Sequence, residues 1–206
     1  MGENIQITLY FKERFIYDPN TFIYEVSKKI NNLGQAITLP INIGNNNPND
    51  DMIPIIIFQQ SQDIQLNANF NNINIVILNL AINVDEIILK IYDIVENFKL
   101  NISRIAFVEN KKFSNEVMAK FKKQYFNDKE VIESDEFNFG WHKCEKFDDI
   151  TVNFWQRFGT NILLSDELYV TYDINTLSDV KNNVDRNFAE KFIKNAKESI
   201  KNNYLK

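Results

Sequence analysis

The residues with the most reactive side chains lie together in the second half of the chain. The only histidine and the only cysteine, His142 and Cys144, are two positions apart. Alternate residues of a β-strand share a face, so on a strand these side chains can form a thiolate–imidazolium pair, with Asp148 or Asp149 orienting the imidazole. The sequence therefore offers one enzymatic alternative, a hydrolase or transferase that uses Cys144 and His142.

Three features of the sequence weigh against chemistry at this pair. No loop of small residues that could hold an oxyanion lies nearby, the pair falls inside a predicted strand and not at its end, and a His-x-Cys pair also occurs by chance. A closed zinc site needs four ligands, and only these two residues are of the types that zinc prefers. The five glycines form no phosphate-binding motif. We therefore expect a non-enzymatic protein with no metal site and no cofactor.

A second group of residues is typical of protein interfaces, where tryptophan, tyrosine and arginine contribute most of the binding energy. In two predicted strands, roughly 149–158 and 166–173, such residues alternate with smaller apolar ones. This alternation places them on the sheet face away from the core, unless the C-terminal helix covers that face. The candidate interaction residues in this half are Asn153, Trp155, Arg157 and Tyr169.

The first half has a row of amides in the corresponding place. Between the apolar residues of the segment Ile64–Phe70 stand Gln65, Asn67 and Asn69. Amides both donate and accept hydrogen bonds, so such a row can bind an extended peptide, a base edge or a partner strand. The alternative is an ordinary solvated face of an antiparallel sheet.

A cluster of lysines supports a third hypothesis, an RNA-binding module. These residues, around a predicted helix in the middle of the chain, are Lys111, Lys112, Lys120, Lys122 and Lys123. The formal net charge of −5 argues against a protein that tracks a phosphate backbone, because that task needs a basic surface. A charge run of this kind is more often a solvated face.

The spacing of apolar residues predicts the same order of elements in each half of the chain: strand, helix, three strands, helix. The final helix has an apolar residue at every fourth position from Val180 to Tyr204. We expect an α+β fold of two βαβββα half-units, residues 1–99 and 100–206, with helices packed on one face of antiparallel sheets and a long C-terminal helix. They form one compact domain or a tightly fused pair; the alternative is a single α+β sandwich. Residues 35–52, rich in Asn and Pro, are predicted to be a loop.

The composition of the chain indicates the size of its core, its cellular compartment and its source. A hydrophobic content of 44% provides for a sizeable core, and a single cysteine fits a reducing compartment. No apolar run is long enough to cross a membrane, and we expect a cytoplasmic protein. Heavy use of Asn, Ile and Lys, whose codons are A/T-rich, indicates a low-GC bacterium or its phage. An open strand edge would allow a homodimer.

The first half of the chain resembles one group of proteins. The prolines Pro40, Pro48 and Pro54, the strands that follow them, and the segment NISRIAFVEN at 101–110 resemble a sporadically distributed group of small prokaryotic proteins of unknown biochemical function. In that group the last strand reads I-x-R-I-G; this chain has Ala106 in place of the glycine. The resemblance implies a defence-linked or mobile-element protein.

The leading hypothesis is accordingly a protein-interaction module of bacterial or phage origin. One form of it is an inhibitor or accessory subunit of a bacterial immune complex of the CRISPR type. A protein partner is expected first, and RNA or a ribonucleoprotein second.

Overall fold

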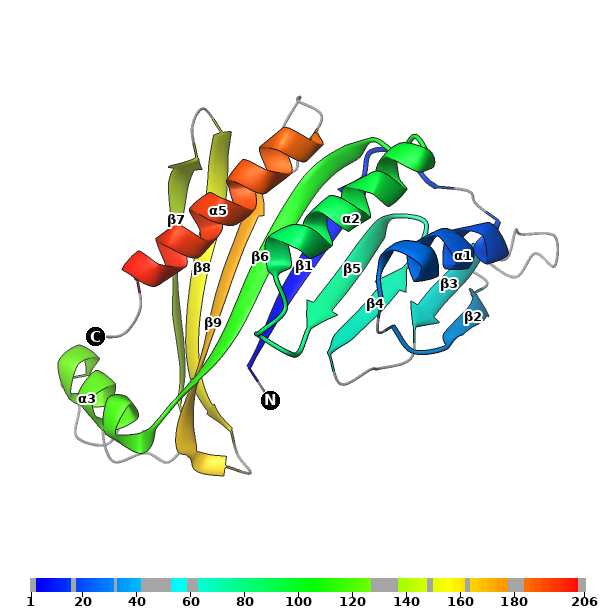
Figure 1. Ribbon diagram of the computed structural model, residues 1–206. Coiled ribbons are helices and arrows are strands. Elements are labelled where there is room, and N and C mark those ends of the chain that lie inside the picture. The colour runs from blue at the N-terminus through cyan, green and yellow to red at the C-terminus, as the bar shows by residue number, and fades with distance from the viewer. Residues whose placement is uncertain are drawn as a thin grey trace, which may run out of the picture.

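The computed structural model describes residues 3–15, 18–31, 33–41, 53–58, 63–126, 137–147, 150–161, 164–177 and 184–203. Within these ranges the chain forms one nine-stranded antiparallel sheet and four helices (Figure 1). The strands are β1 (Asn4–Phe11), β2 (Ala36–Ile41), β3 (Ile53–Phe58), β4 (Ile64–Ala68), β5 (Asn72–Ile77), β6 (Ile102–Phe113), β7 (Asn138–Phe147), β8 (Ile150–Asn161) and β9 (Leu164–Thr176). The helices are α1 (Pro19–Lys29), α2 (Val84–Asn97), α3 (Asn115–Tyr125) and α5 (Arg186–Asn202).

The two halves of the chain share this sheet through its central pair of strands. The strand order is β2-β3-β4-β5-β1-β6-β9-β8-β7, so β1 of the first half lies beside β6 of the second. Ile7 is opposite Phe107, and the flanking pairs Gln6–Val108 and Thr8–Ala106 continue the register. The strands on either side follow in the same relative order. The predicted half-units therefore meet edge to edge about a local two-fold axis near Ile7 and Phe107.

The two halves differ by one strand, which corrects the predicted order for the first half. The range 35–52 was predicted to be a loop, yet Ala36–Ile41 forms β2, pairs with β3 and makes the first half βαββββα. Residues 42–52 lie outside the described residues. The prolines concealed this strand from the pattern, because proline cannot donate to a sheet ladder. Here Pro40 faces Pro54, and such a pair is tolerated at a sheet edge.

The other elements confirm the predicted α+β class with modest changes of boundary. β1 ends at Phe11. Asp18 caps α1. Its carboxylate accepts hydrogen bonds from the Thr21 hydroxyl at 2.7 Å and from Thr21 N at 2.8 Å, and these bonds lower the pKa of Asp18. α5 begins after Asp185, later than the apolar spacing from Val180 suggested.

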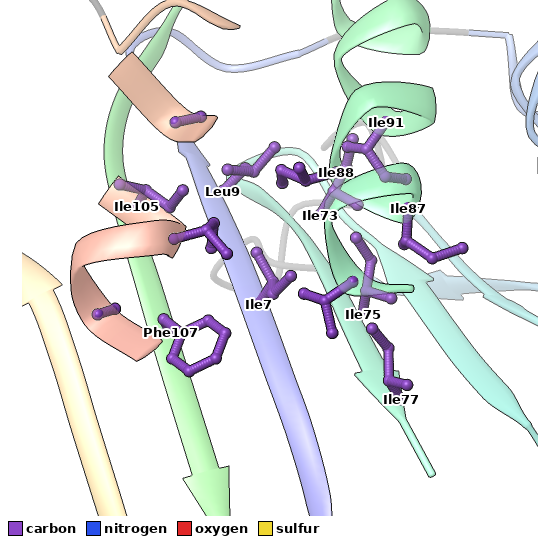
Figure 2. Close-up of a cluster of buried hydrophobic side chains, with 14 of the residues drawn as sticks. Ile7, Leu9, Ile73, Ile75, Ile77, Ile87, Ile88, Ile91, Ile105 and Phe107 are labelled. Atoms are coloured by element: carbon purple, nitrogen blue, oxygen red, sulfur yellow. The ribbon is translucent and has the colours of Figure 1, made fainter. Parts of the chain in front are cut away.

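The four described helices all lie on one face of the sheet. α1, α2 and α5 lie side by side across that face, and α3 packs beside the far end of β7–β9 (Figure 1). Figure 2 shows the centre of the core, where isoleucines of α2 meet those of β1 and β5. The buried residues shown there are Ile7, Leu9, Ile73, Ile75, Ile77, Ile87, Ile88, Ile91, Ile105 and Phe107. No helix in the described part of the chain is long and apolar enough to cross a membrane.

The predicted boundary between the halves falls at the end of α2. Lys99 has a φ of 54°, and the amides of Lys99 and Leu100 donate to the carbonyls of Glu96 and Val95 at 3.0 and 2.9 Å. This is the left-handed helix end at which glycine is usual. It reverses the chain so that β6 can enter the sheet beside β1.

A carboxylate on α2 connects the helices of both halves. Asp93 accepts hydrogen bonds from Arg186 of α5 and from Lys29 of α1, the latter at 3.3 Å, while Arg186 also reaches Glu96 at 3.0 Å. The hydrogen bond from Arg186, followed by that from Lys29, lowers the pKa of Asp93. Asp93 is therefore a link in the helix layer whose contribution depends on pH.

We predict that Asp93→Asn destabilises the protein at neutral pH and loses this effect in acid. Because the folded pKa lies below the ordinary 3.8, the ionised carboxylate stabilises the fold above that value, and protonation removes the effect as pH falls through the lowered pKa. Since the side chain is 40% exposed, the cost at neutral pH should be only about 0.5–1 kcal/mol. Urea unfolding of both proteins at neutral pH and in strong acid measures it. A deficit of equal size in strong acid would contradict this origin.

Candidate functional site

The face of the sheet opposite the helices is the candidate site. Strand alternation directs every second residue to it, and no described helix lies over it (Figure 1). The alternative that the C-terminal helix covers the aromatic residues is therefore wrong, because α5 lies on the other side, where Phe154 and Ile174 are buried. We call this surface the open face. Its character changes from one end to the other.

The β2–β3 end of the open face is apolar. Ile37 and Leu39 of β2 are 40% and 44% exposed, and their partners across the ladder are Ile57 and Ile55. Sequence reasoning missed this patch because it treated the β2 segment as a loop.

The middle of the open face consists of amide and hydroxyl side chains that form hydrogen bonds with one another. Asn74 Oδ1 accepts from Gln6 Nε2 at 2.8 Å and from Thr8 Oγ1 at 2.9 Å. Further along the β1–β6 pair, Asn110 donates to Asn4 at 2.9 Å and accepts from Thr171 at 2.7 Å. These cross-strand bonds fix the orientation of the amides, so the surface is ordered before any partner arrives.

The β7–β8 end is organised around Trp155, which remains 37% exposed. The His142 ring stacks on it at 4.4 Å between centroids, and the Arg157 guanidinium lies 5.5 Å from its centre. Tryptophan and arginine are thereby held in place by neighbours on two strands.

Polar contacts close a ring around this stack. His142 Nε2 is 3.0 Å from Asn153 Oδ1, and Asn153 Nδ2 donates to Asn175 Oδ1 at 3.4 Å. Asn175 Nδ2 in turn donates to Asp173 at 3.0 Å, and Asp173 lies 3.9 Å from Arg157. We call the six residues of this ring the Trp155 cluster: His142, Asn153, Trp155, Arg157, Asp173 and Asn175.

A second arginine joins the cluster to the centre of the open face. Arg104 of β6 donates to Asn175 Oδ1 at 2.9 Å, and its guanidinium lies 5.0 Å from the centre of the Tyr10 ring. Across the open face, the described cations Arg104, Lys112, Lys146 and Arg157 outnumber the anions Glu167 and Asp173. This local excess of positive charge contrasts with the net charge of −5 of the whole chain.

Among the predicted interaction residues, the structure brings Asn153, Trp155 and Arg157 together. Tyr169 shares their face, but it is four positions along β9 from Asp173, the partner of Trp155. Its hydroxyl donates to Glu167 at 2.8 Å, and this bond raises the pKa of Tyr169. Glu167 also pairs with Lys112, so Tyr169 belongs to a separate group.

The predicted amide residues of the first half are distant from that cluster. Gln65 and Asn67 lie on β4 and face the open side, five strand spacings or roughly 24 Å from β8. Asn69 lies beyond the end of β4, where its side-chain oxygen accepts the backbone N–H groups of Asn71 and Asn72 at 2.8 and 3.0 Å. It stabilises a turn and does not extend the row.

The pair considered for catalysis does share the open face. His142 and Cys144 are alternate residues of β7, and Cys144 is exposed. The imidazole, however, is directed to Asn153 and Trp155, and no hydrogen bond joins it to the thiol. Asp148 and Asp149 lie outside the described residues. The imidazole is therefore oriented toward Asn153 and Trp155 and not toward the thiol.

The five lysines of the RNA hypothesis do not share one surface. Lys111 and Lys112 are adjacent in β6 and point to opposite faces, where they pair with Glu109 and Glu167. Lys122 is buried, with its ammonium 5.3 Å from the centre of the Phe137 ring. Lys120 and Lys123 are exposed on α3.

The sequence contained a signal for the cluster members that were missed. Asp173 and Asn175 alternate with buried Tyr172 and Ile174, and the same period that identified Trp155 would have included them. The predicted strand ended at residue 173 and so left out Asn175, whereas Asp173 lay inside it and was not selected. Arg104 had no such signal, because its partner Asn175 is distant in sequence.

The sequence matches no protein-family model, and no curated protein matches it significantly.

We predict that Gly140 of β7 must lack a side chain so that Arg157, its partner on β8, can pack against it. A Cβ atom at Gly140 would lie 3.0 Å from the backbone oxygen of Gln156 and 3.3 Å from Arg157 Cγ. Gly140→Ala should therefore lower the free energy of unfolding by about 1–3 kcal/mol, since a backbone atom cannot move aside easily.

Gly159→Ala is the matched control. Its Cβ would meet nothing closer than Phe137 O at 3.5 Å, so the substitution should be neutral or stabilise by up to about 1 kcal/mol. Chemical denaturation of both variants measures the difference. Equal effects at the two glycines would show that close approach is not the reason for Gly140.

Proposed function

We propose that this protein is a non-enzymatic interaction module that binds a protein partner through its open face, with the Trp155 cluster as the anchor. The observation that carries the proposal is the exposed Trp155 ring, on which the His142 ring stacks and near which the Arg157 guanidinium lies. Aromatic and arginine side chains are the commonest sources of binding energy at interfaces.

Pre-organisation supports this role. Binding normally costs about 0.5–1.5 kcal/mol for each long side chain that becomes ordered at an interface. In the Trp155 cluster, stacking and hydrogen bonds already order Arg157, His142 and Asn153. A partner can therefore contact these groups with little further loss of conformational entropy.

The chemistry of the face indicates what the partner offers. Arg104 and Arg157 make the second half of the open face locally positive, and the amides accept and donate in fixed directions. A partner surface with acidic and hydrogen-bonding groups is complementary to it. The specific form suggested by sequence, a cytoplasmic inhibitor or accessory subunit of a bacterial immune complex, is part of the proposal.

Trp155→Ala tests the proposal. Truncation of an anchoring tryptophan typically costs 2 kcal/mol or more, so the partner captured from host lysate, once purified, should bind about 30-fold more weakly or not at all. Binding is measured by calorimetry, and a thermal melt verifies that the variant is folded.

Tyr24→Ala is the control, because Tyr24 is an aromatic residue that is 63% exposed on α1, away from the open face. It should leave the affinity unchanged. Unchanged binding of the partner by the Trp155→Ala variant would contradict the proposal. A captured partner that is released by nuclease would shift the assignment to RNA.

A further inference from the structure

The two edges of the sheet differ in a way that bears on how a partner binds. β2 forms one edge with six residues, and β7 forms the other with ten. Natural sheets protect their edges with short strands, prolines and charged residues, because an unpaired strand is a template for another chain.

The phase of the backbone hydrogen bonds shows which residues of β7 face outward. Thr160 N donates to Phe137 O at 3.2 Å, which makes Phe137–Thr160 a hydrogen-bonded pair. Such pairs alternate along an antiparallel ladder. The odd-numbered residues of β7 therefore bond to β8, and the even-numbered residues direct their N–H and C=O groups away from the sheet.

Among the residues that the structure describes, none bonds to the outward-facing backbone of β7. Its residues are Asn138, Gly140, His142, Cys144 and Lys146, and no described backbone or side-chain group bonds to their main-chain atoms. The opposite edge is blocked. Because neither Pro40 nor Pro54 has an N–H, their pair is a non-bonded one, and Pro40 directs its nitrogen outward from β2.

The side chains along β7 differ on its two faces. On the open face, the described charged residues of β7 and β8 are both cations, Lys146 and Arg157. Arg157 lies across Gly140, which has no side chain to separate it from a strand beyond. On the helix face, Phe139 is 38% exposed and forms an aromatic group with Trp141 at 5.7 Å and Phe126 at 5.6 Å.

We propose that β7 receives an extended peptide segment of a protein partner as a tenth strand, and that this segment alternates apolar and acidic residues. The inference rests on the proposed function and identifies the part of the partner that engages the site. The residue opposite Gly140 is acidic and reaches Arg157, and its two neighbours are apolar and pack on Phe139 and Trp141. A second acidic residue, six positions away, lies opposite Lys146.

A second copy of this chain fits the edge less well. In an antiparallel pairing of two β7 strands, the open-face residues would again be Asn138, Gly140, His142, Cys144 and Lys146, which supply no carboxylate. Lys146 thus favours an acidic peptide and disfavours a second copy of β7, so one residue contributes to both parts of the specificity.

Selection from a phage-displayed library of random ten-residue peptides against the full chain tests the proposal. We expect enriched sequences with an apolar–acidic–apolar core, and amide shifts on binding that are largest at the even-numbered residues of β7. Enrichment of basic sequences, of no sequence, or of sequences that shift amides elsewhere would overturn the proposal.

Two variants at one position separate backbone pairing from side-chain contact. Cys144→Pro removes an outward N–H without removing a bond to β8, and it should weaken the strongest peptide about tenfold or more. Cys144→Val keeps that N–H and should bind as the natural protein does. Equal binding by both variants overturns the proposal, provided that their thermal melts show folded protein.

Two further measurements distinguish the remaining outcomes. Lys146→Glu should weaken binding of the acidic peptide and strengthen binding of a second peptide with lysine in place of the acidic residue. An unchanged preference would contradict the charge assignment.

If binding of the purified partner is lost with Trp155→Ala but not with Cys144→Pro, the proposed function stands and the β7 inference fails. A dimer in sedimentation that Cys144→Pro dissociates would assign the edge to a second copy and also overturn the inference.

Discussion

The pairing of β1 with β6 is the interaction on which the rest of the structure depends. Taken alone, the sheet of each half would have two edge strands. Pairing of β1 with β6 joins one edge of the first half to one edge of the second, so neither is exposed. The register places Ile7 opposite Phe107 and Leu9 opposite Ile105, so the apolar sides of both halves face the same way. Without this register, the helices of the two halves would not form one continuous layer.

A helix layer on one side alone imposes a second constraint. Every strand must present apolar residues to α1, α2 and α5 and leave the alternate residues to water. Over nine strands this produces a broad surface whose polar groups bond to neighbours on the same strand and on adjacent strands. The bonds of Asn74 with Gln6 and Thr8, and of Asn175 with Asn153 and Arg104, are the result. The ordered open face is thus a consequence of the fold.

The small difference between the halves gives this surface a direction. The first half has an additional strand, β2, whose Pro40 closes that edge. β7 ends the second half with backbone groups to which no described residue bonds. The aromatic and cationic residues gather beside β7, and the apolar isoleucines gather beside β2. A pseudosymmetric scaffold consequently has one end suited to stacking, charge and strand addition.

The sequence by itself determined the α+β class, the order of elements apart from β2 and the face on which Trp155 and Arg157 lie, because strand alternation and helical spacing are local properties of the chain. It could not reveal β2, whose prolines resemble those of a loop, or the role of Asn69, which depends on where β4 ends. Only the tertiary structure decided that Arg104 meets Asn175, that His142 stacks on Trp155 and that Lys111 and Lys112 serve different faces. Those facts depend on strand order and register, which arise from contacts between residues far apart in the sequence.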